Sequence, residues 1–345
     1  MKGFASDNYA GAHPEVLAAI ADANDGHAVP YGADRWTARA EELLREHLGE
    51  QAQSFLVFNG SGANVLALRA LCRPWESVIC AAQAHVNVDE CGAAEAIAGV
   101  KLQDVPTPDA KLTPAHVESL LVRRGDEHAV QQRVVSVTQS TELGTVYSPD
   151  ELRALAGVAH DRGLLVHVDG ARLANAAASL DVSLRAITTD AGVDVVSFGA
   201  TKNGLLLGEA VVFLNPDLAG GFRYLRKQAL QLASKGRFIA AQFIALLEGD
   251  LWRRNAAHAN AMAARLAQAL RGVPGVRLTQ AVQANAIFAV LPPGVAEHLQ
   301  RDWAFYTWDE VTGEVRLVCS WDTTADEVDA FGADVSRSCS AALSG

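Results

Sequence analysis

The sequence predicts an α/β protein with a mainly parallel sheet flanked by helices, followed by a smaller α+β domain. First, strand-like and helix-like segments alternate from about residue 54 to about residue 214, which is typical of parallel sheets with right-handed crossovers. Second, this rhythm changes after about residue 221, where long helical patterns begin. Third, the chain has 345 residues, of which 50% are hydrophobic, enough for a large core and more than one domain.

Apolar segments bounded by glycine and polar residues define the elements of the first part. A glycine-containing break at residues 60–62 separates the first strand from a helix. Ser148 and Glu151 form a capping box that opens another helix, which Gly163 ends. The predicted strands are Phe55–Phe58, Ser77–Ala81, Arg133–Thr138, Leu164–Val168 and one that begins at Val195; the first predicted helix is Ala63–Leu71.

The second part is predicted to contain long helices and a small sheet. Gly221–Leu247 has a helical pattern, and Leu251–Leu270 forms another helix that is Ala-rich and amphipathic. Beyond residue 275 the pattern is strand, helix, strand, and a capping box at Thr324 starts a terminal helix. These three segments are Ala286–Leu291, Val295–Arg301 and Glu314–Ser320. We therefore predict a large domain at residues 1–250 and a small C-terminal domain at residues 251–345.

Asp169 and Lys202 follow the ends of two buried strands. In an open α/β sheet, ligands bind outside the carboxyl ends of the strands. A lysine can form a Schiff base with pyridoxal 5'-phosphate (PLP), and a carboxylate can keep the pyridine nitrogen protonated, so that the ring acts as an electron sink. Arg172, in the turn beyond Asp169, could hold a carboxylate through two hydrogen bonds. The pattern predicts a PLP site; the alternative is a surface lysine and a polar strand end without a chemical role.

Other polar residues near these strand ends have two interpretations each. The segment Asn59–Asn64 joins a strand to a helix and could bind phosphate at the helix N-terminus. As part of a dinucleotide fingerprint it lacks the third glycine, because position 65 is valine. His167 and Asp169 share one face of a strand and could ligate a metal, but no third ligand has a recognisable spacing, so no metal site is predicted. His85 is either structural or stacked on a PLP ring.

Charge and cysteine content argue against several classes of protein. The formal net charge of −11 disfavours a nucleic-acid or anionic-membrane partner. Five cysteines without a CxxC pair disfavour a disulfide framework and a structural zinc site. Residues 1–11 lack the apolar segment of a secretory signal, and no apolar run reaches the roughly 20 residues that span a bilayer. We expect a cytoplasmic protein that acts on a small molecule.

At these residues the chain resembles the low-specificity L-threonine aldolases, PLP enzymes of fold type I (the aspartate aminotransferase-like superfamily). The resemblance runs over nearly the whole length. The matching segments are Phe4–Tyr9, Tyr31-Gly32, Phe58–Gly60, Ala84–Val86, Asp89–Ala93, Thr138-Gln139, His167–Arg172, Phe198–Gly204, Gln231–Lys235 and Arg316–Asp322. It implies retro-aldol cleavage of L-threonine, L-allo-threonine and related β-hydroxy-α-amino acids to glycine and an aldehyde.

The resemblance also implies which residues hold the cofactor. Lys202 would carry PLP as a Schiff base, Asp169 would pair with the ring nitrogen, and His85 would stack on the ring. Gly60 and Ser61 would bind the phosphate.

Further roles implied by the resemblance concern the substrate and a neighbouring subunit. Ser6, Arg172 and Arg316 would hold the substrate α-carboxylate. Tyr31 would enter the site of a neighbouring subunit, and Arg237 would help to bind the neighbour's phosphate. The family forms dimers that pair into tetramers, so a homo-oligomer with shared active sites is expected; the sequence leaves dimer or tetramer open.

One position departs from the family pattern. Many relatives carry a histidine in the loop after the third strand, where it helps with the substrate β-hydroxyl, and here Glu142 takes its place. The base could therefore be His85, a bound water or Glu142. The preference among threonine, allo-threonine and β-aryl serines stays open.

Three other functions are the alternatives. The first is another PLP activity on small amino acids, a β-eliminating lyase or a transaminase. An NAD-dependent oxidoreductase is disfavoured by Val65, and a non-catalytic protein by the presence of Lys202 and Asp169.

Overall fold

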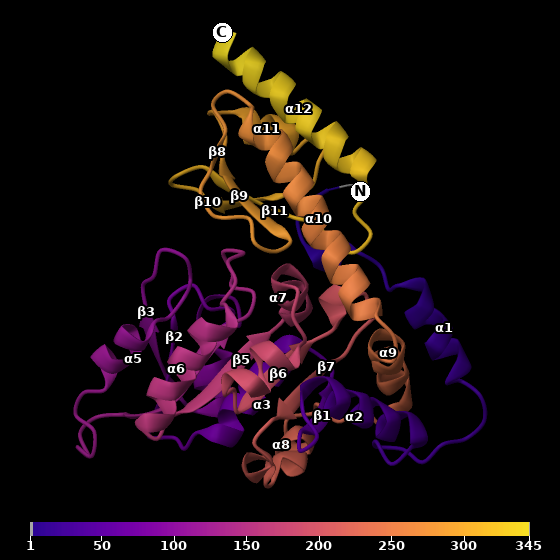
Figure 1. The fold of residues 1–345 in the computed structure, drawn as a ribbon, viewed down its shortest axis with the longest axis vertical. Coiled ribbons are helices and arrows are strands. Elements are labelled where there is room, and N and C mark those ends of the chain that lie inside the picture. The colour runs from indigo at the N-terminus through magenta and orange to yellow at the C-terminus, as the bar shows by residue number, and fades with distance from the viewer. Residues whose placement is uncertain (1–2, 345) are drawn as a thin grey trace.

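The computed structural model describes residues 3–344, and its larger part, the broad base in Figure 1, is built on a seven-stranded sheet. The strand order is β1-β7-β6-β5-β4-β2-β3, in which β7 pairs antiparallel with both neighbours and the other pairs are parallel. The strands are β1 (Gln53–Val57), β2 (Glu76–Ala81), β3 (Lys101–Val105), β4 (Gln131–Thr138), β5 (Leu165–Gly170), β6 (Val195–Gly199) and β7 (Glu209–Phe213). The predicted mainly parallel sheet is confirmed.

Helices cover both faces of this sheet because successive residues of a buried strand point to opposite sides. On β4, Val135 packs into the core on one face and Val134 into the core on the other. The first core includes residues of α2 (Arg35–Leu48), α6 (Pro149–Asp161), α7 (Leu173–Leu180) and α9 (Arg237–Leu247); the second includes α3 (Gly60–Leu71) and α8 (Phe222–Gln228). The other helices of the base are α1 (Pro14–Asp22), α4 (His85–Val88) and α5 (Pro114–Leu120).

The smaller part is a four-stranded antiparallel sheet with the order β10-β11-β9-β8, packed against two long helices (Figure 1). Phe4, near the N-terminus, packs into this second core, and the backbone N–H of Val318 donates to the Phe4 carbonyl at 2.7 Å. The elements are α10 (Leu251–Arg271), β8 (Arg277–Leu278), β9 (Ala286–Val290), α11 (Val295–Leu299), β10 (Tyr306–Asp309), β11 (Glu314–Val318) and α12 (Ala325–Ser344). The domain boundary after residue 250 stays a prediction.

The prediction of one helix over Gly221–Leu247 is wrong. The structure has α8 and α9 there, separated by a non-helical segment at residues 229–236. Contacts with distant parts of the chain hold that segment. The side chain of Gln231 accepts a hydrogen bond from the Phe58 N–H at 2.9 Å, and the carbonyl of Ser234 accepts one from the Tyr31 N–H at 2.9 Å. These contacts override the local helical pattern.

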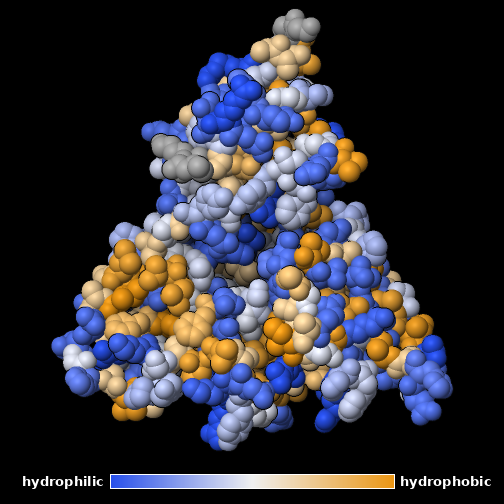
Figure 2. Space-filling model, turned by 180° about the vertical axis from the view of Figure 1, so that it is seen from behind, coloured by the Kyte–Doolittle hydropathy of each residue, from blue (hydrophilic) through white to orange (hydrophobic). Residues whose placement is uncertain are grey.

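The surface is hollowed where the smaller part meets the broad base (Figure 2). Apolar residues gather over parts of the base in the same view. Among the described residues, no helix has both the length and the apolar character that a membrane crossing requires.

Candidate active site

A cavity of about 280 Å³ opens at the carboxyl ends of β5 and β6. Its lining includes the end of β5, the turn after β6, the N-terminus of α3 and the first residue of α4. Five of the predicted site residues line it: Gly60, Ser61, His85, Asp169 and Lys202. The fold therefore brings together residues that lie up to 142 positions apart in the chain, from 60 to 202.

Lys202 lies in a short 3₁₀ turn, η5 (Thr201–Asn203), directly after β6. The close approach of β6 to the turn after β5 requires a glycine before it, because a Cβ at Gly199 would lie 2.5 Å from the Cα of Ala171. Lys202 forms no ion pair with any carboxylate that the structure describes. The positive charge of Arg172 and burial lower the pKa of Lys202, which favours the neutral, nucleophilic amine.

Asp169 is buried at the end of β5, and each of its oxygens accepts a hydrogen bond. Oδ1 accepts from the N–H of Ala171 at 2.9 Å, and Oδ2 accepts from Nδ2 of Asn64 at 2.8 Å. Both donors fix the position of the side chain, and a carboxylate held in this way can pair with a protonated pyridine nitrogen.

His85 is paired with a buried carboxylate. Its Nδ1 lies 2.9 Å from Oε1 of Glu90, whose side chain is fully buried, whereas 39% of the His85 side chain is exposed. The hydrogen bond to Glu90 raises the pKa of His85. Because Glu90 accepts at Nδ1, the neutral ring carries its lone pair on Nε2, the nitrogen that is left to accept a proton.

Glu142 lies in the loop between β4 and α6. Its Oε1 accepts hydrogen bonds from the Thr138 hydroxyl and from the backbone N–H of His85, each at 2.7 Å. Its Oε2 is buried and has no hydrogen-bond partner among the described residues. Burial raises the pKa of Glu142 to about 7. Glu142 does not line the cavity; it ties the loop to the start of α4.

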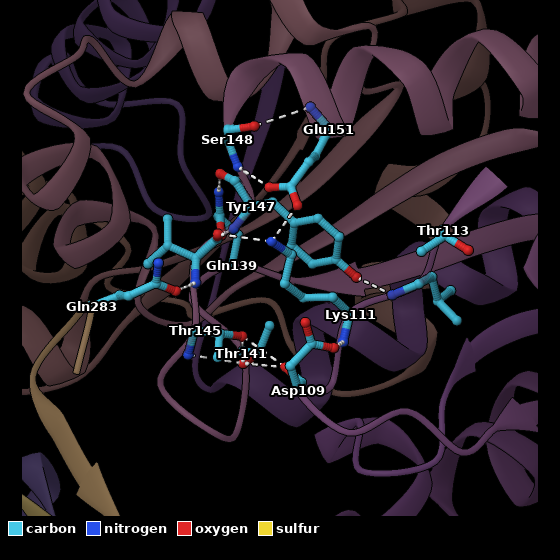
Figure 3. A network of polar contacts seen from close by, with 12 residues as sticks. Asp109, Lys111, Thr113, Gln139, Thr141, Thr145, Tyr147, Ser148, Glu151 and Gln283 are labelled. Atoms are coloured by element: carbon cyan, nitrogen blue, oxygen red, sulfur yellow. Dashed lines mark hydrogen bonds and ion pairs between the residues drawn. The ribbon is translucent and has the colours of Figure 1, made fainter. Parts of the chain in front are cut away.

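A network of polar contacts fixes the loop that carries Glu142 (Figure 3). The side chain of Gln139 accepts from the Tyr147 N–H at 3.0 Å and donates to the Tyr147 carbonyl at 2.8 Å. The N–H of Val146 donates to Oε1 of Gln283 at 2.9 Å. Both ends of the loop are therefore held together, and Gln283 ties it to the segment that precedes β9.

The two arginines predicted to hold the substrate carboxylate differ in their partners. Arg172 forms a bidentate ion pair with the buried carboxylate of Asp7, at 2.7 and 2.9 Å. Arg316, on β11, forms no ion pair with any carboxylate that the structure describes. Its guanidinium lies 4.7 Å from the ring centre of Trp308 and 5.7 Å from that of Tyr306. Arg316 is thus the guanidinium left without a carboxylate partner.

Neither these two arginines nor the other three predicted residues, Ser6, Tyr31 and Arg237, line the cavity of their own chain. Ser6 caps η1 (Asp7–Tyr9) and accepts a hydrogen bond from the N–H of Asn8, which lines the cavity. Arg237 borders a separate pocket and donates to the Gly26 carbonyl at 3.1 Å. Tyr31 is 51% exposed. The predicted roles of Arg237 and Tyr31 in a neighbour's site stay predictions.

His167, considered as a metal ligand, has both ring nitrogens occupied. They lie 2.9 Å from the hydroxyl of Ser136 and 3.0 Å from that of Ser197. Burial lowers the pKa of His167 to about 4, so the ring is neutral at physiological pH. It serves as a hydrogen-bonded bridge across β4, β5 and β6.

The cavity residues provide the groups that PLP needs. Lys202 is an amine of lowered pKa, and Asp169 is a carboxylate held by two donors. At the start of α3 the side chain of Asn59 accepts from the Gly62 N–H, which leaves the N–H groups of Gly60 and Ser61 for an anion. An amine, an acid and an anion-binding helix N-terminus around one cavity fit the cofactor.

For four buried residues of the site, the sequence predicted no individual role. Asn64 and Glu90 contact Asp169 and His85, Asp7 pairs with Arg172, and Glu209 lines the cavity and accepts from the Ala200 N–H at 2.5 Å. Burial raises the pKa of Glu209 to about 7. Only Glu209 has a clear signal in the sequence, an acid within the apolar strand pattern at residues 209–213.

Comparison with known proteins agrees with this geometry. Residues 3–291 match the family model described as beta-eliminating lyase. The low specificity L-threonine aldolases of Pseudomonas aeruginosa PAO1 and Pseudomonas sp. NCIMB 10558 are 48% and 46% identical to the chain, each over 96% of both sequences. The solved threonine aldolase of Leishmania major superposes with a TM-score of 0.93 at 34% identity, over 98% of this chain and 99% of that one. The predicted fold type I is confirmed, and the chain belongs to the beta-eliminating lyase family and, within it, to the low-specificity L-threonine aldolases.

Proposed function

We propose that this protein is a PLP-dependent aldehyde-lyase that cleaves L-threonine, L-allo-threonine and related β-hydroxy-α-amino acids to glycine and an aldehyde. The observation that carries the proposal is the 48% identity to a low specificity L-threonine aldolase over 96% of both chains. The cavity supports it, because Lys202, Asp169 and the N-terminus of α3 surround a space of about 280 Å³.

The cofactor supplies the electron sink, since its ring can stabilise the carbanion left at Cα when the Cα–Cβ bond breaks. Lys202 is the amine that would hold it, and its lowered pKa makes that amine a usable nucleophile. Asp169 is the carboxylate that would keep the ring nitrogen protonated. Gly60 and Ser61 offer N–H groups to the phosphate.

Arg316 is the arginine left free to bind the substrate carboxylate, and it lies outside the lining of the cavity, as Arg172 does. It has a free guanidinium edge, whereas Arg172 already forms a bidentate pair with Asp7. Burial and the nearby positive charge of Arg172 lower the pKa of Arg316, so both arginines contribute positive charge to one region. A carboxylate bound there fixes the orientation of the amino acid, which is how binding prepares one bond for cleavage.

His85 is the proposed base for the β-hydroxyl proton. It lines the cavity and presents Nε2, because Glu90 occupies Nδ1. Glu142 is the weaker candidate, since it does not line the cavity and its Oε1 already accepts two hydrogen bonds. We expect His85→Asn to reduce turnover more than PLP content, and Glu142→Gln to keep most of the turnover. Equal loss of turnover and PLP in His85→Asn would make His85 a cofactor contact only.

A homo-oligomer, a dimer or a pair of dimers in the cytoplasm, completes the proposal. Lys202 is the only lysine or arginine among the described residues that line the cavity. A phosphate group of about −2 charge calls for a further cation, which Arg237 of a neighbouring subunit could supply. The exposed Tyr31 lies near the same segment, through its backbone bond to Ser234.

The decisive experiment is acetaldehyde release from L-threonine by the PLP-loaded protein, with Lys202→Ala as the control. Release by the parent and none by the variant supports PLP-dependent aldol cleavage at Lys202. Ammonia and a keto acid in place of glycine and acetaldehyde would overturn the proposal in favour of elimination. A yellow parent that releases no acetaldehyde would exclude threonine as the substrate.

A further inference from the structure

We propose that Asn64 is a positioning residue that couples Asp169, the acid that would pair with the cofactor, to the pair formed by His85 and Glu90. The proposal deepens the proposed function and rests on it, because Asp169 and His85 matter only if they act on the cofactor and the substrate. A hydrogen-bonded chain carries it: His85 Nδ1 to Glu90 Oε1, Glu90 Oε1 to Asn64 Nδ2, and Asn64 Nδ2 to Asp169 Oδ2.

The amide nitrogen of Asn64 serves both carboxylates at once. Asn64 is 2% exposed and lies on the second turn of α3. Its Nδ2 donates to Glu90 Oε1 at 2.9 Å and to Asp169 Oδ2 at 2.8 Å. An amide nitrogen carries two protons, so both of them are used here.

The two carboxylates also fix which way the amide points. A flipped amide would place its oxygen against two carboxylate oxygens, a repulsive arrangement. The Oδ1 of Asn64 has no hydrogen-bond partner among the described residues, so no contact on the other side opposes this orientation. The orientation of Asn64 is therefore set by Glu90 and Asp169 together.

Without Asn64, the two carboxylates would face each other unshielded. Two oxygens bonded to the same nitrogen lie within about 6 Å, the range in which like charges repel each other appreciably. This repulsion would push the two acids apart. A displaced Asp169 would hold a pyridinium nitrogen less well, and a displaced Glu90 would loosen its control of the His85 tautomer.

Asn64 is not replaced by another donor close by. The other oxygen of Asp169, Oδ1, accepts a hydrogen bond from the Ala171 N–H. The other oxygen of Glu90, Oε2, has no hydrogen-bond partner among the described residues. Three other charged groups interact electrostatically with this series of hydrogen-bonded residues. Lys202 interacts with His85, and Glu142 and Arg172 interact with Asp169. None of these three donates a hydrogen bond to Asp169 or Glu90 in the described structure.

The test replaces Asn64 by leucine, which has nearly the same shape and no donor. PLP is titrated into the full-length, cofactor-stripped chain, and binding is followed by its visible absorption. We expect Asn64→Leu to weaken PLP binding by about 10-fold to 100-fold, the effect of losing a hydrogen bond to a charged group. The matched control is Asn175→Leu, a buried helical asparagine that donates to Oδ1 of Asn260 and does not line the cavity.

A second variant separates coupling from simple loss of packing. Glu90→Gln removes one of the two facing charges, so we expect Asn64→Leu/Glu90→Gln to bind PLP more tightly than Asn64→Leu alone. Additive losses in this double-mutant cycle would overturn the proposal, as would equal losses in Asn64→Leu and Asn175→Leu. If Asn64→Leu does not fold, Asn64→Ala takes its place in the same cycle. The PLP titration uses no threonine, so a failed cleavage assay would reject the proposed function without deciding this result.

Discussion

At the scale of single residues, the charge of Arg316 is balanced differently from that of Arg172. Arg172 is neutralised by Asp7, which also accepts from the amide of Asn285 at 3.0 Å. Arg316 instead lies against the rings of Tyr306 and Trp308, and aromatic faces attract a guanidinium without neutralising it. Arg316 is therefore a cation held in a fixed position without a carboxylate partner among the described residues.

Replacing Arg316 tests this asymmetry. We expect Arg316→Lys to raise KM for L-threonine by about 10-fold with a smaller change in kcat, because lysine keeps the charge but loses the planar fork that binds both carboxylate oxygens. Steady-state kinetics measure the effect. Arg265→Lys is the control, since Arg265 forms an ion pair with Asp329 on the surface between α10 and α12. An unchanged KM in Arg316→Lys would remove Arg316 from substrate binding.

Glu209 makes stability depend on pH. Burial raises the pKa of Glu209 from 4.5 to about 7. Between these two pH values, the folded state therefore keeps a proton that the unfolded state has released. The stability that the folded state has with Glu209 protonated is fully present below about pH 4.5 and is lost as the pH rises towards 7. We expect Glu209→Gln to gain stability relative to the parent between pH 5 and pH 8, by at most about 3 kcal/mol.

Urea denaturation at pH 5 and pH 8 measures this gain. Glu151→Gln is the control, because hydrogen bonds to Lys111 and to the Ser148 backbone lower the pKa of Glu151. Its contribution is lost only at acidic pH, so its effect should be the same at both values. A parallel pH dependence in Glu209→Gln and the parent would contradict the assignment.

At the scale of elements, the close approach of β6 to the turn after β5 positions Lys202 relative to Asp169. We expect Gly199→Ala to destabilise the protein by about 1–3 kcal/mol and to lower PLP content, because its Cβ would meet the backbone of Ala171 at 2.5 Å. Gly157→Ala, in α6, has no atom within 4 Å of its new Cβ and should stabilise the protein by about 0.5–1 kcal/mol. Urea midpoints and bound PLP distinguish the two. Equal effects of both substitutions would show that the approach at Gly199 is not restrictive.

Local signals explain which elements could be predicted. Ser148 and Glu151 form the capping box that opens α6, and both of its hydrogen bonds are present. The break between α8 and α9 depends instead on Gln231, which reaches Phe58 across 173 positions. A window of a few residues contains the first kind of information and not the second.

The same distinction applies to the site. Asp169 and Lys202 could be predicted because Asp169 lies at the end of a recognisable buried strand and Lys202 follows another. The roles of Asn64 and Glu90 could not be predicted, because only the folded chain defines their contacts. Asn64 contacts Asp169, 105 positions away, and Glu90 contacts His85, 5 positions away. Glu142 stands out in the sequence because it differs from the family pattern, and the structure shows that it contacts the start of α4.

At the scale of the whole molecule, Arg237 and Tyr31 lie away from the cavity of their own chain, which raises the question of how chains assemble into an oligomer. Arg237 borders the segment at residues 26–30, in a pocket distinct from the one that contains Lys202. If these residues act in a neighbour's site, then one active site needs Lys202 from one chain and Arg237 from another. Two variants that are each inactive should then restore each other.

Mixing Lys202→Ala with Arg237→Ala tests this arrangement. After the chains are dissociated and reassembled together, random pairing places an intact Lys202 and an intact Arg237 in about a quarter of the sites. We expect acetaldehyde release to recover towards that fraction, while each variant treated alone stays inactive. Lys202→Ala mixed with Asp169→Ala is the control, because both residues line the same cavity of one chain and no hybrid regains a complete site. No recovery in the test mixture would place the contacts of Lys202 and Arg237 within a single chain, and recovery in the control would show that Lys202 and Asp169 do not act in the same chain.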